Sequence, residues 1–147
     1  MDHVVIMKKE WGLLPKILSG VKKVESRWYK FKIAPWNKVK KGDILYFKDS
    51  GGQVTVKAKV TDVHQYFIES DRHALEIMQK YAKLDLGVTD IPIPIKNYIK
   101  NKKFAIFVFF TDVKKTNPIN INKTGFGLQS AWLCVKNIES IKKIALL

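Results

Sequence analysis

The sequence predicts one α+β domain, built on a curved, mainly antiparallel sheet or small β-barrel with peripheral helices. The chain has 147 residues, of which 46% are hydrophobic, so residues 1–147 suit one domain with a real core. Strand-like alternation occurs at the start, in the middle and near the end of the chain, and helical spacing occurs between. A short glycine turn joins the two middle strands, which favours antiparallel pairing.

The N-terminal elements are expected to be a strand, a short helix and a second extended segment. Residues 3–7, "HVVIM", are typical of a strand. Residues 13–20, "LLPKILSG", favour a helix with Pro15 in its first turn and Gly20 at its C-terminal end. Residues 24–32, "VESRWYKFK", are expected to be extended, so that successive side chains face opposite ways. A loop over residues 34–43 follows.

The middle of the chain predicts a β-hairpin and a long helix. Residues 42–63 give two strands around the turn "DSGG" at 49–52. The second strand alternates apolar and polar residues, which indicates a half-buried strand with a basic outer face. Residues 70–87 switch to helical spacing, with Ser70 or Asp71 as the N-cap and Gly87 at the end. The expected buried face of that helix consists of Leu75, Met78, Ala82 and Leu86.

The C-terminal half is expected to supply a central strand and a final strand. Residues 91–101 contain two prolines and favour a connector with one or two helical turns. Residues 102–113, "KKFAIFVFFTDV", are apolar on both faces, which predicts a strand covered on both sides. A loop over residues 117–130 then leads to a last strand in "AWLCV".

Charge is the main compositional indication of function. Lysine and arginine number 27 and aspartate and glutamate 13, which gives a net charge of +14. This excess favours polyanionic partners, with nucleic acid as the first candidate. Two alternatives stay open: the lysines solvate the surface without a specific partner, or the basic face binds an acidic protein.

Other classes of protein are disfavoured by what the sequence lacks. Cys134 is the single cysteine, so no intrachain disulfide can form and a cytoplasmic location is expected, with a buried structural thiol. No signal peptide is visible, and the longest apolar run is too short to cross a bilayer, so no membrane partner is expected. The three histidines lack the spacing of a metal site, and no cofactor motif is present, so neither a metal nor a cofactor is predicted.

Residues 20–27, "GVKKVESR", place two lysines, a glutamate and an arginine directly after a helix-ending glycine. A glutamate between cations can orient a lysine or an arginine through charge-assisted hydrogen bonds. The remaining ammonium and guanidinium donors would then be available for a phosphate or a base edge. The alternative is a surface ion-pair cluster that contributes little to stability.

This run resembles the GxKxxExR signature of the ASCH superfamily, through Gly20, Lys22, Glu25 and Arg27. The segments "KILSGVKKVESRW", "VKKGDILYFK" and "VKAKVTDV" are similar to that superfamily as well, and "FGLQSAWL" extends the resemblance into the C-terminal part. The resemblance implies a PUA-like β-barrel. It also implies a cleft between the barrel and its N-terminal helix, where the signature residues bind RNA or a nucleotide.

Whether the protein is an enzyme is left open by this resemblance. Some superfamily members hydrolyse acylated cytidine-type nucleosides or cut RNA, and the hydrolase branch uses a lysine with a threonine three positions later. Here the residue three positions after Lys22 is Glu25, which removes the hydroxyl nucleophile. A small hydrolase with Lys22 and Glu25 as an acid/base pair is therefore the alternative to a binding module.

Further residues complete the predicted ligand site. Ser26 lies inside the signature, and Trp28 and Trp36 flank it, where each can stack on a base or belong to the core. Lys48 and Ser50 lie at the glycine turn, where backbone N–H groups can approach a phosphate. The polar pair Gln129 and Ser130 in "TGFGLQSAW" can close over a ligand.

Overall fold

The structure is a computed structural model that describes residues 1–127 and 130–143. Its strands are β1 (Asp2–Met7), β2 (Val24–Tyr29), β3 (Ile44–Asp49), β4 (Val54–Phe67), β5 (Phe104–Ile119) and β6 (Trp132–Val135). Its α-helices are α1 (Leu13–Leu18), α2 (Asp71–Leu86) and α3 (Ile93–Ile99), and two 3₁₀ turns are η1 (Lys9–Trp11) and η2 (Ile138–Ile141).

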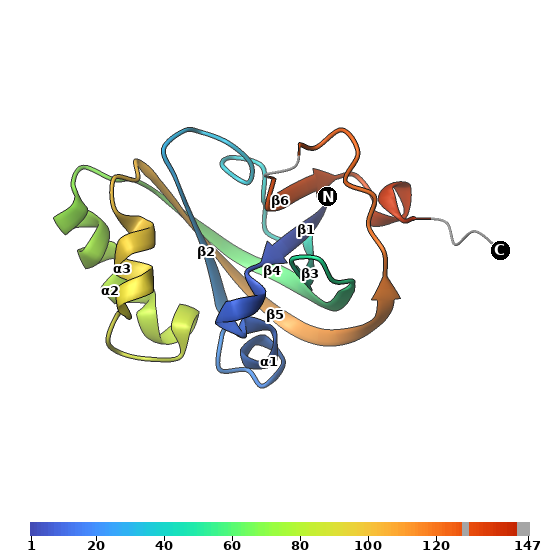
Figure 1. Cartoon of the computed structure of the whole chain (residues 1–147), viewed down its shortest axis with the longest axis horizontal. Helices are drawn as coiled ribbons and strands as arrows, with labels where there is room; N and C mark the ends of the chain where they lie inside the picture. The colour runs from blue at the N-terminus through green and yellow to red at the C-terminus, as the bar shows by residue number, and fades with distance from the viewer. Residues whose placement is uncertain (128–129, 144–147) are drawn as a thin grey trace.

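The described strands form one mixed sheet in the order β2-β5-β4-β3-β1-β6. Every neighbouring pair is antiparallel except β1 and β3, which run parallel. The long strands β4 and β5 change register at several bulges, which increase the local bend of a sheet. The sheet curves into a half-barrel (Figure 1), so the predicted α+β class and mainly antiparallel sheet are confirmed.

The concave face of the sheet holds the largest core. Alternate residues of β5, such as Ile106 and Val108, pack there with Leu45 and Phe47 of β3. Leu14 and other buried residues of α1 pack against this same core. The alternation of side chains along each strand therefore places the remaining residues on the opposite face.

The other face of the sheet is covered by two different parts of the chain. Helices α2 and α3 lie together at the β2 end (Figure 1) and bury Trp28 and Phe107 against Met78 and Ile95. At the other end, the chain after β5 covers a small cluster that includes Val4 and Leu133. Strand β5 is thus covered on both faces, as its sequence predicts.

Helix α2 begins and ends where the sequence predicts, but one buried position was wrong. Ser70 Oγ accepts a hydrogen bond from the His73 N–H, and Gly87 follows the helix with a φ of 74°. Leu75, expected on the buried face, is 38% exposed. The buried face is rotated toward Tyr81, which stacks on Phe107 of β5, and toward Asp85, which pairs with Lys22 just before β2.

Candidate functional site

The residues of the signature lie where α1 turns into the edge strand β2. Helix α1 ends at Leu18, and Gly20 adopts a φ of 81°, a left-handed conformation that glycine takes without strain. The Lys22 N–H then donates to the Lys16 carbonyl at 3.0 Å, which fixes the turn before β2 starts at Val24.

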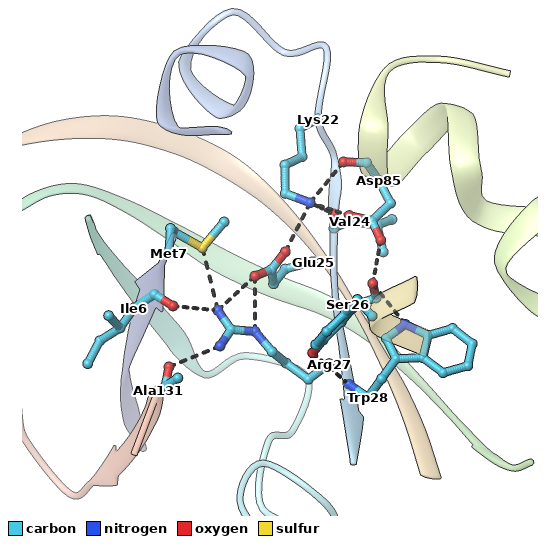
Figure 2. A network of polar contacts seen from close by, with 11 residues as sticks. Ile6, Met7, Lys22, Val24, Glu25, Ser26, Arg27, Trp28, Asp85 and Ala131 are labelled. Atoms are coloured by element: carbon cyan, nitrogen blue, oxygen red, sulfur yellow. Dashed lines mark hydrogen bonds and ion pairs between the residues drawn. The ribbon is translucent and has the colours of Figure 1, made fainter. Parts of the chain in front are cut away.

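Lys22 is directed into the protein, and its side chain has no exposed surface. Its ammonium donates to the carbonyls of Val24 at 2.7 Å and Asp85 at 2.8 Å. It also forms ion pairs with the carboxylates of Glu25, at 3.0 Å, and Asp85 (Figure 2). An ammonium has three donors. These partners use all of them, so the expectation that Lys22 keeps donors for a ligand is not met.

Glu25 joins the two cations of the signature. One carboxylate oxygen pairs with Lys22, and the other accepts from Arg27 Nε at 3.0 Å and from a terminal Arg27 nitrogen at 2.8 Å. Burial opposes the charge on Glu25, but the charges of Lys22 and Arg27 outweigh it and hold the pKa of Glu25 below its usual value. Glu25 is therefore an anion that fixes both neighbouring cations in place.

Arg27 connects the two ends of the half-barrel. From β2 its guanidinium reaches the carbonyls of Ile6 in β1, at 2.9 Å, and of Ala131 just before β6, at 3.1 Å (Figure 2). Strands β2 and β6 are the two edges of the sheet. In a closed barrel the two edge strands would pair with each other. Here the Arg27 side chain spans the gap between these edges, which we call the seam.

A second polar group extends from the signature to α2. Asp85 accepts from the Ser26 hydroxyl with one carboxylate oxygen and from Lys22 with the other. The Ser26 oxygen in turn accepts from Trp28 Nε1 at 3.3 Å. Burial raises the pKa of Asp85, although the charge of Lys22 opposes that change. The cluster of Lys22, Glu25, Arg27 and Asp85 has two positive and two negative charges, so the cations of the signature are balanced internally.

A cleft of about 480 Å³ runs along the seam. Its floor includes Glu25, Ser26, Arg27, Trp28 and Asp85. That volume lies within the usual range for pockets that hold small molecules.

The outer wall of the cleft combines aromatic rings with lysines. Trp11 and Tyr98 meet edge to face with 5.9 Å between ring centroids. The Lys8 ammonium lies 4.8 Å from the Trp11 centroid, and the Lys102 ammonium lies 5.2 Å from the Tyr98 centroid. Burial, with repulsion from Lys30 and Lys8, lowers the pKa of Lys102. The net positive charge at this site is therefore on its rim and not on its floor.

The structure brings together most of the signature residues named from the sequence. The cleft is lined by Glu25, Ser26, Arg27 and Trp28. Lys22 does not line the cleft, and its buried ammonium forms an ion pair with Glu25. Trp28 is 1% exposed and its ring meets Phe107 edge to face, so its faces are occupied by the core.

Other predicted site residues lie away from the cleft. Trp36 packs in the core against Phe67 and Phe104. Lys48 is buried at the end of β3 and Ser50 is exposed in the hairpin turn, where its N–H donates to the Met7 carbonyl at 2.8 Å.

The C-terminal loop supplies one described residue of the predicted pair. Ser130 lines a hollow next to the cleft, which shares Tyr29 and Ala131 with it. The Ser130 hydroxyl donates to the Phe126 carbonyl. Gln129 lies outside the described residues.

The sequence analysis did not select Asp85 or the residues of the outer wall. Asp85 lies three residues after Ala82, a residue of the expected buried face of the helix. This spacing places the Asp85 carboxylate on the buried side as well. The wall residues are Lys8, Trp11, Tyr98 and Lys102, which are distant in sequence and carry no shared motif.

The structure gives no sign of a metal site or a spanning helix in the part of the chain that it describes. No group of three or more histidine, cysteine or carboxylate residues is placed to hold a metal ion there. No helix within that part is long and apolar enough to cross a bilayer.

The protein is thus an α+β half-barrel, and its candidate site is a cleft at the edge strand β2. In the search of solved structures, the chain is similar to crystal structures of ASCH from Zymomonas mobilis, including one tyrosine-to-phenylalanine and one serine-to-alanine variant. Each has a TM-score of 0.65 and 15% identity, with 95% of this chain and 90–93% of the other covered. No family model and no curated protein matches the sequence. The resemblance to the ASCH domain is thus confirmed at the level of the fold.

Proposed function

We propose that the protein is a binding module for RNA or a nucleotide, and that the ligand occupies the seam cleft. The observation that carries this proposal is the cleft wall, where Lys8 and Lys102 lie over the rings of Trp11 and Tyr98. Aromatic rings stack on any base, and neighbouring lysines neutralise phosphates. The net charge of +14 supports the same class of ligand.

The roles of floor and rim differ in this proposal. The floor is charge-balanced and presents carboxylate oxygens of Glu25 and Asp85, which have lone pairs left for an amino group. A base with an exocyclic amino group fits these acceptors, since carboxylates accept from such groups. The rim lysines supply the attraction for the phosphate, and the signature keeps the floor in shape.

The test compares RNA affinity of the wild type with that of Lys8→Ala and Lys102→Ala. Each variant should lose about 1.5–3 kcal/mol of binding free energy, the usual value of a hydrogen bond to a charged group. Lys57→Ala removes an exposed lysine of β4 and is the matched control for charge alone. Equal small losses in all three variants, or none, would contradict binding in the cleft.

Hydrolysis of RNA or of an acylated cytidine nucleoside is the second candidate. One observation favours it, namely that the Ser26 hydroxyl and the Asp85 carboxylate are hydrogen-bonded to each other and both line the cleft. Such a pair is better placed for acid/base work than Lys22, which does not line the cleft. Turnover by the wild type that is lost in Ser26→Ala and Asp85→Asn, with affinity retained, would establish it over simple binding.

A further inference from the structure

A row of aromatic residues crosses the sheet where β2 and β4 end and β5 begins. Tyr29 pairs with Phe104, and Phe104 pairs with Phe67. Directly paired residues project from the same face of a sheet, so the three side chains form one row. Neighbouring strands lie about 4.8 Å apart, so the outer Cα atoms of the row are about 10 Å apart. Tyr29 lines the seam cleft, and Phe67 is therefore the end of the row that lies away from the cleft.

The side chains become more exposed along this row. Tyr29 and Phe104 are half-buried beside the core of the concave face, whereas Phe67 is 63% exposed. The Phe67 ring meets the rings of Trp36 and Phe104 edge to face, with 5.4 and 5.6 Å between centroids. These contacts hold the ring in place while most of it faces solvent.

The loop after β2 adds a cation and two more apolar side chains at the exposed end of the row. The Lys32 ammonium lies 5.4 Å from the Phe67 centroid and 5.9 Å from the Phe104 centroid. In the described part of the chain, no carboxylate forms an ion pair with Lys32. Phe31 and Ile33, its neighbours in sequence, are 73% and 51% exposed. We call Lys32, Phe67 and Phe104 the aromatic patch. Exposed apolar residues that gather in this way are typical of an interaction surface.

The surface between the aromatic patch and the seam cleft is continuous and basic. Tyr29 lines both the cleft and a hollow of about 400 Å³ beside it, and Ile33 lines that hollow as well. The Lys103 N–H donates to the Tyr29 carbonyl at 2.9 Å. This bond brings Lys30, which follows Tyr29, next to the segment that carries Lys102 of the cleft wall. A ligand with a charged backbone fits such a path, because each lysine can neutralise a phosphate.

We propose that the aromatic patch binds an unpaired base of an RNA strand whose neighbouring nucleotides extend toward the seam cleft. The role of the cleft in holding the rest of that strand rests on the proposed function. An aromatic ring stacks on any base, and a lysine beside it can neutralise the phosphate of the same nucleotide. RNA alternates flat bases with phosphates, which matches the combination of the Phe67 ring and the Lys32 ammonium. An acidic protein would supply the charge for Lys32 without a flat ring for Phe67.

The test compares the binding of adenosine monophosphate and of a short oligoadenylate to the wild type and to three variants of Phe67. The oligoadenylate can reach the cleft and the patch together, whereas the mononucleotide fills only the cleft. Phe67→Ala should weaken oligoadenylate binding about 5- to 100-fold, the usual contribution of one stacked base, and should leave mononucleotide binding unchanged. Phe67→Leu should lose nearly as much, because leucine is apolar but has no flat ring. Phe67→Tyr should keep the wild-type affinity, because it retains the ring.

Ile93→Ala is the matched control, because it shortens an apolar side chain that is 71% exposed at the start of α3. It should leave both affinities unchanged. Lys32→Gln tests the phosphate contact separately. It should reduce the slope of log oligoadenylate affinity against log salt by about 0.7, the value for one single-strand phosphate.

Three results would overturn the proposal. The first is that Phe67→Ala or Phe67→Leu binds oligoadenylate as tightly as the wild type. The second is that Phe67→Ala weakens the binding of both ligands equally, since the residue would then act through the shape of the cleft. The third is that Phe67→Ala abolishes self-association of the protein without affecting RNA, since the patch would then be a contact between copies of the chain.

The rim variants Lys8→Ala and Lys102→Ala report on the cleft independently of the patch. Both should weaken the binding of the mononucleotide and of the oligoadenylate. If oligoadenylate binding responds to Phe67→Ala but not to the rim variants, the patch is supported and the proposed function of the cleft is wrong. If it responds to the rim variants but not to Phe67→Ala, the cleft is supported and the patch proposal is wrong.

Discussion

Substitution of Glu25 by glutamine tests whether the signature holds the seam of the half-barrel together. The change keeps the size of the side chain and removes its charge. In the wild type, one oxygen of Glu25 pairs with Lys22 at 3.0 Å and the other with Arg27 at 2.8 Å. Glutamine has a single acceptor oxygen, and its amide NH₂ would face one of the two cations.

The expected loss follows from the charges that remain. Without Glu25, the cluster keeps Lys22, Arg27 and Asp85 and has a net charge of +1 in a site where these side chains are 8% exposed or less. Removing one partner of a buried ion pair costs about 3–5 kcal/mol. For a domain of this size each kcal/mol lowers the melting temperature by about 2–4 °C, so a fall of roughly 6–20 °C is expected.

The assay is chemical denaturation with Glu76→Gln as the matched control. Glu76 makes an ion pair with Arg72 at 3.4 Å on the surface of α2, where both side chains are exposed. Such a pair contributes about 0–1 kcal/mol, so this control should unfold close to the wild type. The reasoning is refuted if Glu25→Gln and Glu76→Gln have the same free energy of unfolding.

Three further predictions concern the core, the response to pH and the response to salt. Trp36→Ala should cost about 3–5 kcal/mol of stability, since Trp36 is a core residue; full stability with lost RNA binding would instead make it a ligand contact. Burial lowers the pKa of His3 despite its hydrogen bond to Asp43. As the pH falls, His3 is therefore protonated in the unfolded chain before it is protonated in the folded protein. The free energy of unfolding should therefore be level above the ordinary histidine value of 6.5 and fall below it, and His3→Gln should lessen that fall; an unchanged pH profile in His3→Gln would contradict this. RNA binding with about 3–5 phosphate contacts should show a log–log salt slope of roughly −2 to −4, and affinity that is insensitive to salt would exclude the basic surface as its source.

The order of elements followed from local patterns in the sequence. Alternation in residues 54–60 and apolar character on both faces of residues 102–113 predicted β4 and β5, because side-chain period and burial are local properties of a strand. Ser70 and Gly87 marked the ends of α2, because caps depend on neighbouring backbone groups. The spacing of residues 20–27 located the strand that carries the candidate site.

The use of each charged side chain was decided by the tertiary structure. Whether Lys22 meets a ligand or the protein depends on Asp85, which lies 63 residues away in sequence and reaches it because α2 packs against β2. The span of Arg27 from β2 to Ile6 and Ala131 exists because the sheet curls its two edges toward each other. Lys48 and Trp36 were predicted as site residues from their neighbours in the sequence. In the structure, the charges that act on Lys48 are those of Lys123 and Lys143. The ring of Trp36 packs against Phe67 and Phe104. The sequence determined which residues are charged and which strand holds them, and the curvature of the sheet decided which of those charges neutralise one another.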